Sequence, residues 1–325
     1  MKKGKISITL AGLCFLSFTG CGKSEWVTFS DTKKDQITSI VESGTSIWYG
    51  TRTGLVQFDK ATEKRKVYTV NNGLPDNDIK YVTRDAKGKI WIGTNLGLSS
   101  FDGQNWDVYS TAESKLPGDL INGIAFENTT VWAATGGGLG RFDGTEWTPY
   151  THTNSGLLDD VAQCVVVDPA GNKWIGTQDG GVFKFKDTTW VGYDTTSYSP
   201  IKMPVVNIKS IAIEKSGILW LGTARGLMRF DGKKIELYNT KNSGIPDNLI
   251  RGLAIDGAGN KWIATTKGLV KFDGTKWTTY TIANSKLPAD RVTAVFVGDK
   301  DHIWVGCEGW GLTVFRETGV TLTEE

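Results

Sequence analysis

The stretch Ile90-Trp91-Ile92-Gly93-Thr94 decides the fold, because close copies of it recur along the whole chain. Each copy reads Trp, an apolar or aromatic residue, Gly or Ala, and then Thr, which is replaced by Cys in the last copy. The seven copies begin at Trp48, Trp91, Trp132, Trp174, Trp220, Trp262 and Trp304. These tryptophans are 43, 41, 42, 46, 42 and 42 residues apart, and a period of about 40–45 residues is typical of one blade of four short strands.

Each copy contains four short apolar stretches, which residues 79–82, 90–92, 98–101 and 106–109 illustrate. The last two are joined by Asp102-Gly103. Asp-Gly between two alternating runs predicts a hairpin, because both central positions of such a turn need positive φ. One four-stranded sheet cannot bury its two apolar faces alone, whereas seven stacked around an axis can. The sequence therefore predicts an all-β, seven-bladed β-propeller with four antiparallel strands per blade.

The two ends of the repeat region predict how the ring closes. Residues 26–29 (Trp-Val-Thr-Phe) match the fourth stretch of a unit, and they precede the first unit. The seventh unit has its first three stretches through Phe315 and then only a weak match at 320–323. We expect the N-terminal strand to complete the seventh blade and to cover its open edge. The alternative is a C-terminal strand over residues 318–323.

The first residues predict export. Three lysines precede a mostly apolar run over residues 6–18, which is too short to cross a bilayer because a spanning helix needs about 20 residues. Phe18-Thr19-Gly20-Cys21 resembles a bacterial lipoprotein signal, with lipidation at Cys21. The predicted organisation is a signal peptide over 1–20, a short anchor linker over 21–24 and a single propeller domain over 25–325, membrane-anchored on the extracytoplasmic side. The alternative is ordinary cleavage near the same site without lipid.

The cysteines and the overall charge exclude other classes. Cys164 and Cys307 occupy positions that other copies fill with Ser, Gly, Ala or Thr, which predicts small buried thiols without a disulfide. Hydrophobic residues make up 39% of the chain and charged residues 22%, an ordinary globular mixture. Without Lys2, Lys3 and Lys5, the 37 basic residues fall to 34, against 35 acidic ones. Such a balance predicts no nucleic-acid partner, since that requires a basic surface.

The repeated string Leu-Pro-Asp, Gly-x-x-Trp-x-Gly-Thr, Gly-Leu and Phe-Asp-Gly-x-x-Trp-x-x-Tyr resembles the two-component regulator propeller repeat over residues 25–316. In that family such propellers form the periplasmic sensing part of membrane histidine kinases, often linked to glycan perception, or occur as stand-alone envelope proteins. The resemblance implies the stand-alone form, since the sequence after Phe315 predicts no transmembrane helix, kinase or DNA-binding domain.

Departures from the repeat indicate candidate ligand-binding residues. In a propeller, the loops between second and third strands share a face with the segments that lead to the next blade. Trp310 is the one tryptophan outside the repeated positions, and Tyr198 lies in a longer connection over 194–206. The other variable loop tips are Arg52, Asn95, Gln178, Asp179, Arg225, Lys267 and Glu308. These mixed polar tips favour a neutral, hydroxyl-rich ligand; the alternatives are ordinary solvated loops and a Trp310 that packs on its neighbour.

A second set of residues occupies one position before the first strand of six units: Asp35, Asn77, Asp119, Asp160, Asn248 and Asp290. Asp and Asn in such loops usually accept hydrogen bonds from nearby backbone amides. We expect this structural role for them, and the alternative is a ring that binds a cation at the channel mouth.

The sequence predicts no catalytic constellation, no metal site and no cofactor. Its two histidines, His152 and His302, fall on opposite faces of the predicted ring. The function expected is a non-catalytic binding or sensing module for a glycan or protein partner. One alternative is a lyase or hydrolase resembling the seven-bladed streptogramin lyase, with His152 as the base, and another is an architectural subunit of an envelope complex.

Overall fold

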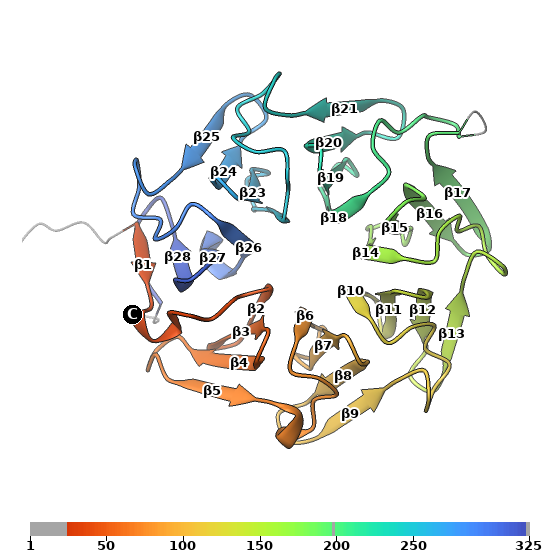
Figure 1. Ribbon diagram of the computed structural model, residues 1–325, viewed down its shortest axis with the longest axis horizontal. Coiled ribbons are helices and arrows are strands. Elements are labelled where there is room, and N and C mark those ends of the chain that lie inside the picture. The colour runs from red at the N-terminus through yellow and green to blue at the C-terminus, as the bar shows by residue number, and fades with distance from the viewer. Residues whose placement is uncertain (1–24, 197–198, 323–325) are drawn as a thin grey trace, which may run out of the picture.

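The computed structural model describes residues 25–196 and 199–322, which form seven four-stranded antiparallel sheets around a central axis (Figure 1). The first blade comprises β2 (Ser39–Ser43), β3 (Ser46–Thr51), β4 (Gly54–Asp59) and β5 (Arg65–Tyr68), and the second comprises β6 (Ile79–Arg84), β7 (Ile90–Thr94), β8 (Leu98–Phe101) and β9 (Trp106–Tyr109). The third blade comprises β10 (Ile121–Glu127), β11 (Thr130–Thr135), β12 (Gly138–Phe142) and β13 (Trp147–Tyr150), and the fourth comprises β14 (Ala162–Val167), β15 (Lys173–Thr177), β16 (Val182–Lys186) and β17 (Thr189–Tyr193).

The fifth blade comprises β18 (Ile208–Ile213), β19 (Leu219–Thr223), β20 (Leu227–Phe230) and β21 (Ile235–Tyr238), and the sixth comprises β22 (Gly252–Ile255), β23 (Lys261–Thr265), β24 (Gly268–Phe272) and β25 (Trp277–Tyr280). The seventh blade comprises β26 (Val292–Val297), β27 (Ile303–Cys307), β28 (Gly311–Phe315) and the N-terminal strand β1 (Trp26–Thr28). Three single-turn 3-10 helices complete the described elements: η1 (Ser30–Thr32), η2 (Val70–Asn72) and η3 (Asp299–Asp301). The predicted fold class is confirmed. No helix in the described ranges has the length and apolarity needed to span a bilayer.

The repeated Trp-x-Gly-Thr string is the second strand of each blade, and each of its positions has a local reason. Trp91 stacks on Tyr109 of its own blade and meets Phe126 of the next blade edge-on. A Cβ on Gly93 would lie 2.7 Å from the Ile121 side chain of the neighbouring inner strand. The Thr94 hydroxyl donates a 2.8 Å hydrogen bond to the Gly97 carbonyl and so holds the hairpin end. The motif therefore encodes both the blade and its contact with the next one.

The hydrophobic core lies between blades. One cluster joins Trp48 and Leu55 of the first blade to Ile79, Ile92 and Phe101 of the second, and six similar clusters follow around the ring. Cys164 and Cys307 are buried free thiols, as predicted. Each blade therefore obtains its buried surface from its neighbours.

The N-terminal strand closes the ring, which confirms the prediction. β1 pairs antiparallel with β28, with Trp26 opposite Phe315 (Figure 1). Thr32 is fully buried; its hydroxyl donates to the Phe29 carbonyl and accepts from the Leu312 amide, both at 2.8 Å. Residues 318–322 form no strand, so within the described residues the C-terminal alternative does not hold.

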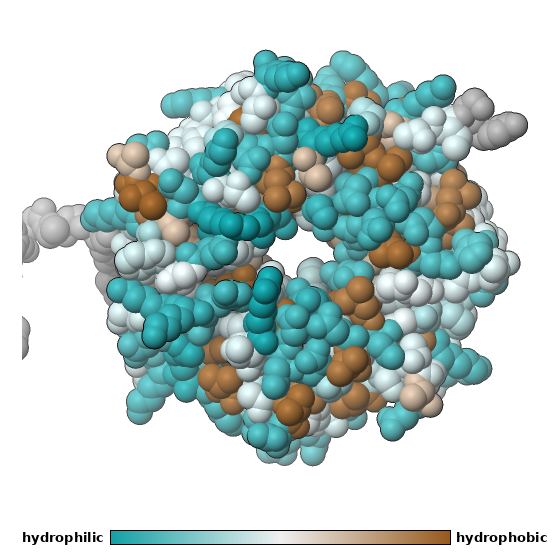
Figure 2. Space-filling view, viewed as in Figure 1, coloured by the Kyte–Doolittle hydropathy of each residue, from teal (hydrophilic) through white to brown (hydrophobic). Residues whose placement is uncertain are grey.

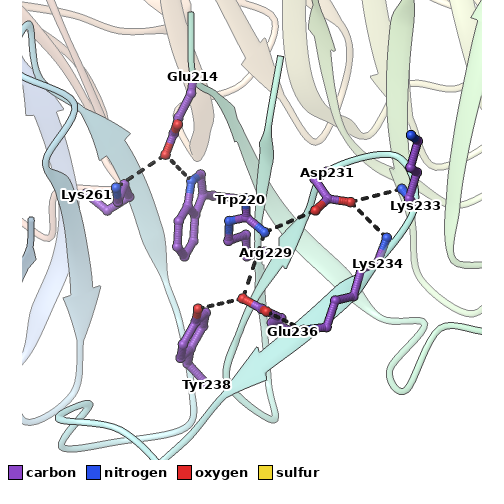
Figure 3. Close-up of polar contacts among 9 residues, drawn as sticks. All are labelled: Glu214, Trp220, Arg229, Asp231, Lys233, Lys234, Glu236, Tyr238 and Lys261. Atoms are coloured by element: carbon purple, nitrogen blue, oxygen red, sulfur yellow. Dashed lines mark hydrogen bonds and ion pairs between the residues drawn. The ribbon is translucent and has the colours of Figure 1, made fainter. Parts of the chain in front are cut away.

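In five blades an acidic residue at the end of the first strand or in the following turn accepts a hydrogen bond from the blade's tryptophan, whereas Trp304 Nε1 of the seventh blade is buried without an acceptor. Glu214 illustrates the arrangement: it accepts from Trp220 Nε1 at 2.7 Å and from Lys261 Nζ of the next blade at 3.3 Å (Figure 3). Asp168 and Asp256 accept from their tryptophans at 3.0 and 2.9 Å. These turn acids are thus structural, and Glu214 also links two blades.

Candidate functional site

Two sets of loops lie on the same face of the ring, as predicted, and we call it the loop face. It comprises the hairpin ends between second and third strands and the segments that cross from each outer strand to the next inner strand (Figure 1). Backbone hydrogen bonds tie the sets together: the Gly97 amide donates to the Asp119 carbonyl at 2.9 Å, and the Glu308 amide to the Arg291 carbonyl at 3.0 Å. The hairpin ends are therefore held against the ring.

A cavity of about 500 Å³ opens at the inner rim of the loop face, and we call it the channel mouth. Its charged lining residues come from the first, fifth, sixth and seventh blades: Arg52, Lys209, Arg251, Arg291 and Glu308. Below it lies the central channel, a cavity of about 320 Å³ lined by the inner strands of all seven blades. The two cavities share Thr38, Lys209, Arg251 and Thr293. Figure 2 shows the opening at the centre of the ring, surrounded mostly by hydrophilic residues.

The channel mouth carries an excess of positive charge. Glu308 forms an ion pair with Arg291. Within the described residues, the side chains of Arg52, Lys209 and Arg251 form no ion pair, and Arg251 Nε is buried without a hydrogen-bond acceptor. Three cations therefore face one cavity without a carboxylate of their own.

Lys209 lies at an irregularity in the inner strand of the fifth blade, which the repeat pattern did not reveal. The pairing of β18 with β19 shifts by one residue between Ile208 and Ser210, so Lys209 is a bulged residue, and a bulge re-aims a side chain. Arg251 follows Ile250 at the same repeat position. The sequence does contain a signal for these cations. One position per repeat, the second residue of the inner-strand segment, holds three cations and no carboxylate: Thr38, Lys80, Asn122, Gln163, Lys209, Arg251 and Thr293.

The structure brings together only two of the loop-tip residues predicted from sequence. Arg52 and Glu308 both line the channel mouth. Asn95 donates to Asp76 and Asp78, each at 3.2 Å. The remaining tips are exposed on the loop face outside the mouth: Gln178, Asp179, Arg225 and Lys267. Tyr198 and Cys21 lie outside the described residues.

Trp310 lies at the end of the β27–β28 hairpin, where its side chain is 43% exposed. Lys33 Nζ is 4.8 Å from the centre of the indole ring, a cation–π contact. Trp310 therefore packs partly on the neighbouring loop, does not line the channel mouth, and keeps part of its ring open to solvent.

The Asp and Asn residues before the inner strands have the structural role predicted for them. The carboxylate oxygens of Asp119, Asp160 and Asp290 accept from the backbone amides eight residues earlier at 2.7–2.8 Å. Asp35 differs, because it accepts from the Tyr49 hydroxyl at 2.8 Å, and burial raises the pKa of both groups. No group of three or more potential metal ligands occurs among residues 25–196 and 199–322.

The two histidines have unrelated environments. His152 Nδ1 lies 2.5 Å from Asp160 Oδ2 on the loop face. His302 follows η3 in the turn between β26 and β27, on the opposite face, where burial lowers its pKa. Because His152 and His302 lie on opposite faces of the ring, they cannot act together on one substrate.

The family model for the two component regulator propeller matches residues 73–96. Two extracellular domains of putative hybrid two component systems from B. thetaiotaomicron are similar in structure. One has a TM-score of 0.74 and 24% identity over 90% of this chain and 41% of its own. The other has a TM-score of 0.72 and 18% sequence identity, and the match covers 91% of this chain and 40% of the other chain. The present chain therefore spans about two fifths of their length.

A lyase has the same architecture. Virginiamycin B lyase from Staphylococcus aureus matches with a TM-score of 0.70 and 13% identity, over 89% of this chain and 97% of the lyase. At these identities the likeness to all three structures is one of fold. A search of curated proteins found no match. The chain is thus a seven-bladed propeller that carries the two-component regulator propeller repeat.

Proposed function

We propose that this protein is a non-catalytic binding or sensing module that presents its loop face to a glycan or protein partner outside the cytoplasm. The observation that carries the proposal is the channel mouth, where charged and polar side chains from four blades face one cavity and three of the cations have no ion-pair partner among the described residues. Backbone hydrogen bonds of the loop face hold the main chain of Arg251, Arg291 and Glu308 in place. Two of the similar structures are extracellular domains of putative two component systems, which supports a sensing role.

The proposal includes an anchor at Cys21. Four residues, 22–25, separate this cysteine from the start of β1, a reach of about 13–14 Å when extended. β1 belongs to the seventh blade, so lipidation would hold that side of the ring near a membrane. Signalling would then require a membrane partner. Mass spectrometry of the protein purified from membranes tests the anchor, because a lipidated Cys21 adds the mass of the lipid to the N-terminal peptide.

A thermal-melt screen of the chain from residue 22 tests the binding function. The panel contains neutral and acidic oligosaccharides, peptidoglycan fragments and divalent ions. A ligand at 100 times its Kd adds about 2.7 kcal/mol to stability, so a true ligand raises the melting temperature measurably. Trp310→Ala reports whether the exposed indole contributes. A flat panel would exclude these sugars and leave a protein partner, which a pull-down from membranes then tests.

A lyase is the second candidate, because His152 lies beside a carboxylate on the loop face of a lyase-like ring. A basic imidazole positioned by an acid is a frequent general-base arrangement. Turnover of virginiamycin B that is lost in His152→Ala would support this candidate, and no turnover by the wild type would remove it.

A further inference from the structure

We infer that the channel mouth binds the carboxylate of an acidic saccharide. The inference rests on the proposed function and names the chemistry of its ligand. The mouth is lined by four cationic side chains and one carboxylate, Glu308, and that carboxylate is already paired with Arg291. The three remaining cations, Arg52, Lys209 and Arg251, therefore create a local positive potential at the entrance of the channel.

Arg251, which is partly buried, contrasts with two buried lysines of the chain, whereas Arg52 and Lys209 are exposed to solvent. Lys173 and Lys261 are 6% and 5% exposed at their side chains, and each pairs with a glutamate, Glu127 or Glu214. Arg251, by comparison, has a buried Nε without an acceptor. A buried donor without a partner is costly, so an acceptor supplied from outside would stabilise the site.

The form of the cavity favours a small acidic sugar over a protein or a nucleic acid. Its volume of about 500 Å³ falls within the roughly 300–1,000 Å³ of small-ligand pockets. Arginine presents a planar fork that matches a carboxylate. Gln36 lines the same cavity and can bond a sugar hydroxyl, and the hydroxyls of Thr38 and Thr293, which already donate to backbone carbonyls, can still accept from one. A nucleic acid would instead need an extended basic stripe.

This ligand differs from the neutral one expected from the hairpin tips. The neutral ligand was expected from the variable tips alone, where basic residues are mixed with Asn, Gln, Asp and Glu. Lys209 and Arg251 come from inner-strand positions, and ring closure places them beside Arg52. The charge of the mouth therefore depends on residues from two different parts of the repeat.

Isothermal titration of the full chain with uronate oligosaccharides tests the inference. The probes are trimers of galacturonate and mannuronate and a hyaluronan tetramer, each beside its neutral methyl ester. We expect at least one acid to bind, its methyl ester to bind at least tenfold more weakly, and the Kd of the acid to rise between 50 and 200 mM salt. Lys209→Gln and Arg251→Gln should each weaken binding at least tenfold. Lys267→Gln, an exposed cation on the same face outside the mouth, should leave it unchanged.

Two further measurements keep the test decisive. Arg52→Gln alters an exposed side chain and so addresses the mouth even if Arg251→Gln fails to fold; it should also weaken binding. Neutral oligosaccharides that bind as tightly as the acids would overturn the acidic ligand and leave the proposed function intact. A hexaglutamate peptide that binds while all uronates fail would overturn the saccharide. Failure of every sugar, peptide and membrane pull-down would overturn the binding function itself.

Discussion

At the scale of single residues, Glu214 provides a direct test of the contacts that join the blades. Its carboxylate accepts hydrogen bonds from Trp220 and from Lys261, whose side chain is 5% exposed (Figure 3). Glu214→Gln removes the charge that compensates this buried lysine. We expect the free energy of unfolding at pH 7 to fall by about 1–3 kcal/mol, measured by urea titration.

Glu236 is the matched control for this prediction. It lies on the outer strand of the same blade, where it contacts Lys234, Arg229 and the Tyr238 hydroxyl near the surface (Figure 3). Exposed pairs contribute little and are screened by salt, so Glu236→Gln should leave the urea midpoint nearly unchanged in 0.5 M salt. An equal loss in both variants would show that the Glu214 contacts have no special role.

The same site predicts a pH dependence. Burial acts to raise the pKa of Glu214, but the hydrogen bonds from Trp220 and Lys261 outweigh it and leave the pKa below its ordinary value. A carboxyl whose pKa is lower in the folded state stabilises the fold above its unfolded pKa, and that contribution is lost as the pH falls through the folded pKa. The difference between wild type and Glu214→Gln should therefore shrink in acid. A difference that stays constant down to the acid limit of the fold would contradict this assignment.

At the scale of secondary-structure elements, β1 is the strand that completes the ring. Trp26 is 7% exposed, and its ring lies 4.5 Å from Phe315 and 5.8 Å from Tyr280, measured between ring centres. Trp26→Ala leaves a cavity at the closure, and Trp→Ala in a core typically costs about 3–5 kcal/mol. We expect a large drop in the urea midpoint, with self-association visible by light scattering where the β28 edge is exposed.

Trp310→Ala is the control for the closure, since it removes the same side chain from a position that is 43% exposed. It should shift the midpoint only slightly. Comparable losses in the two variants would mean that β1 is not what holds the ring together.

The elements could be predicted from sequence because their signals are local. The predicted stretch 106–109 coincides with β9 (Trp106–Tyr109), since a period of two residues and an Asp-Gly turn fix a short strand. The channel mouth could not be predicted in the same way. Lys209 is directed by a bulge, and Arg52 and Glu308 meet only when the ring closes. Trp310, singled out by its position in the sequence, lies outside that cavity.

At the scale of the whole molecule, the location of the core between blades predicts that the ring unfolds as one unit. Each hydrophobic cluster takes side chains from neighbouring blades, for example Trp220 of the fifth and Ile263 of the sixth. Closure by β1 leaves no terminal blade from which unfolding could begin. Loss of one blade therefore exposes apolar surface on both neighbours, and the remaining arc no longer has a closed core.

Ile175→Ala tests this cooperativity, because Ile175 is fully buried in the fourth blade and far along the chain from the closure. Such a substitution typically costs about 2–5 kcal/mol. We expect a single calorimetric transition that moves to lower temperature. Amides of β27 in the seventh blade should then exchange with deuterium faster by the same factor as those of β15, because both open only when the whole ring unfolds. Faster exchange confined to β15 and its neighbours would instead show that the blades open independently. In that case, sensing would have to depend on local opening of a blade rather than on a rigid ring.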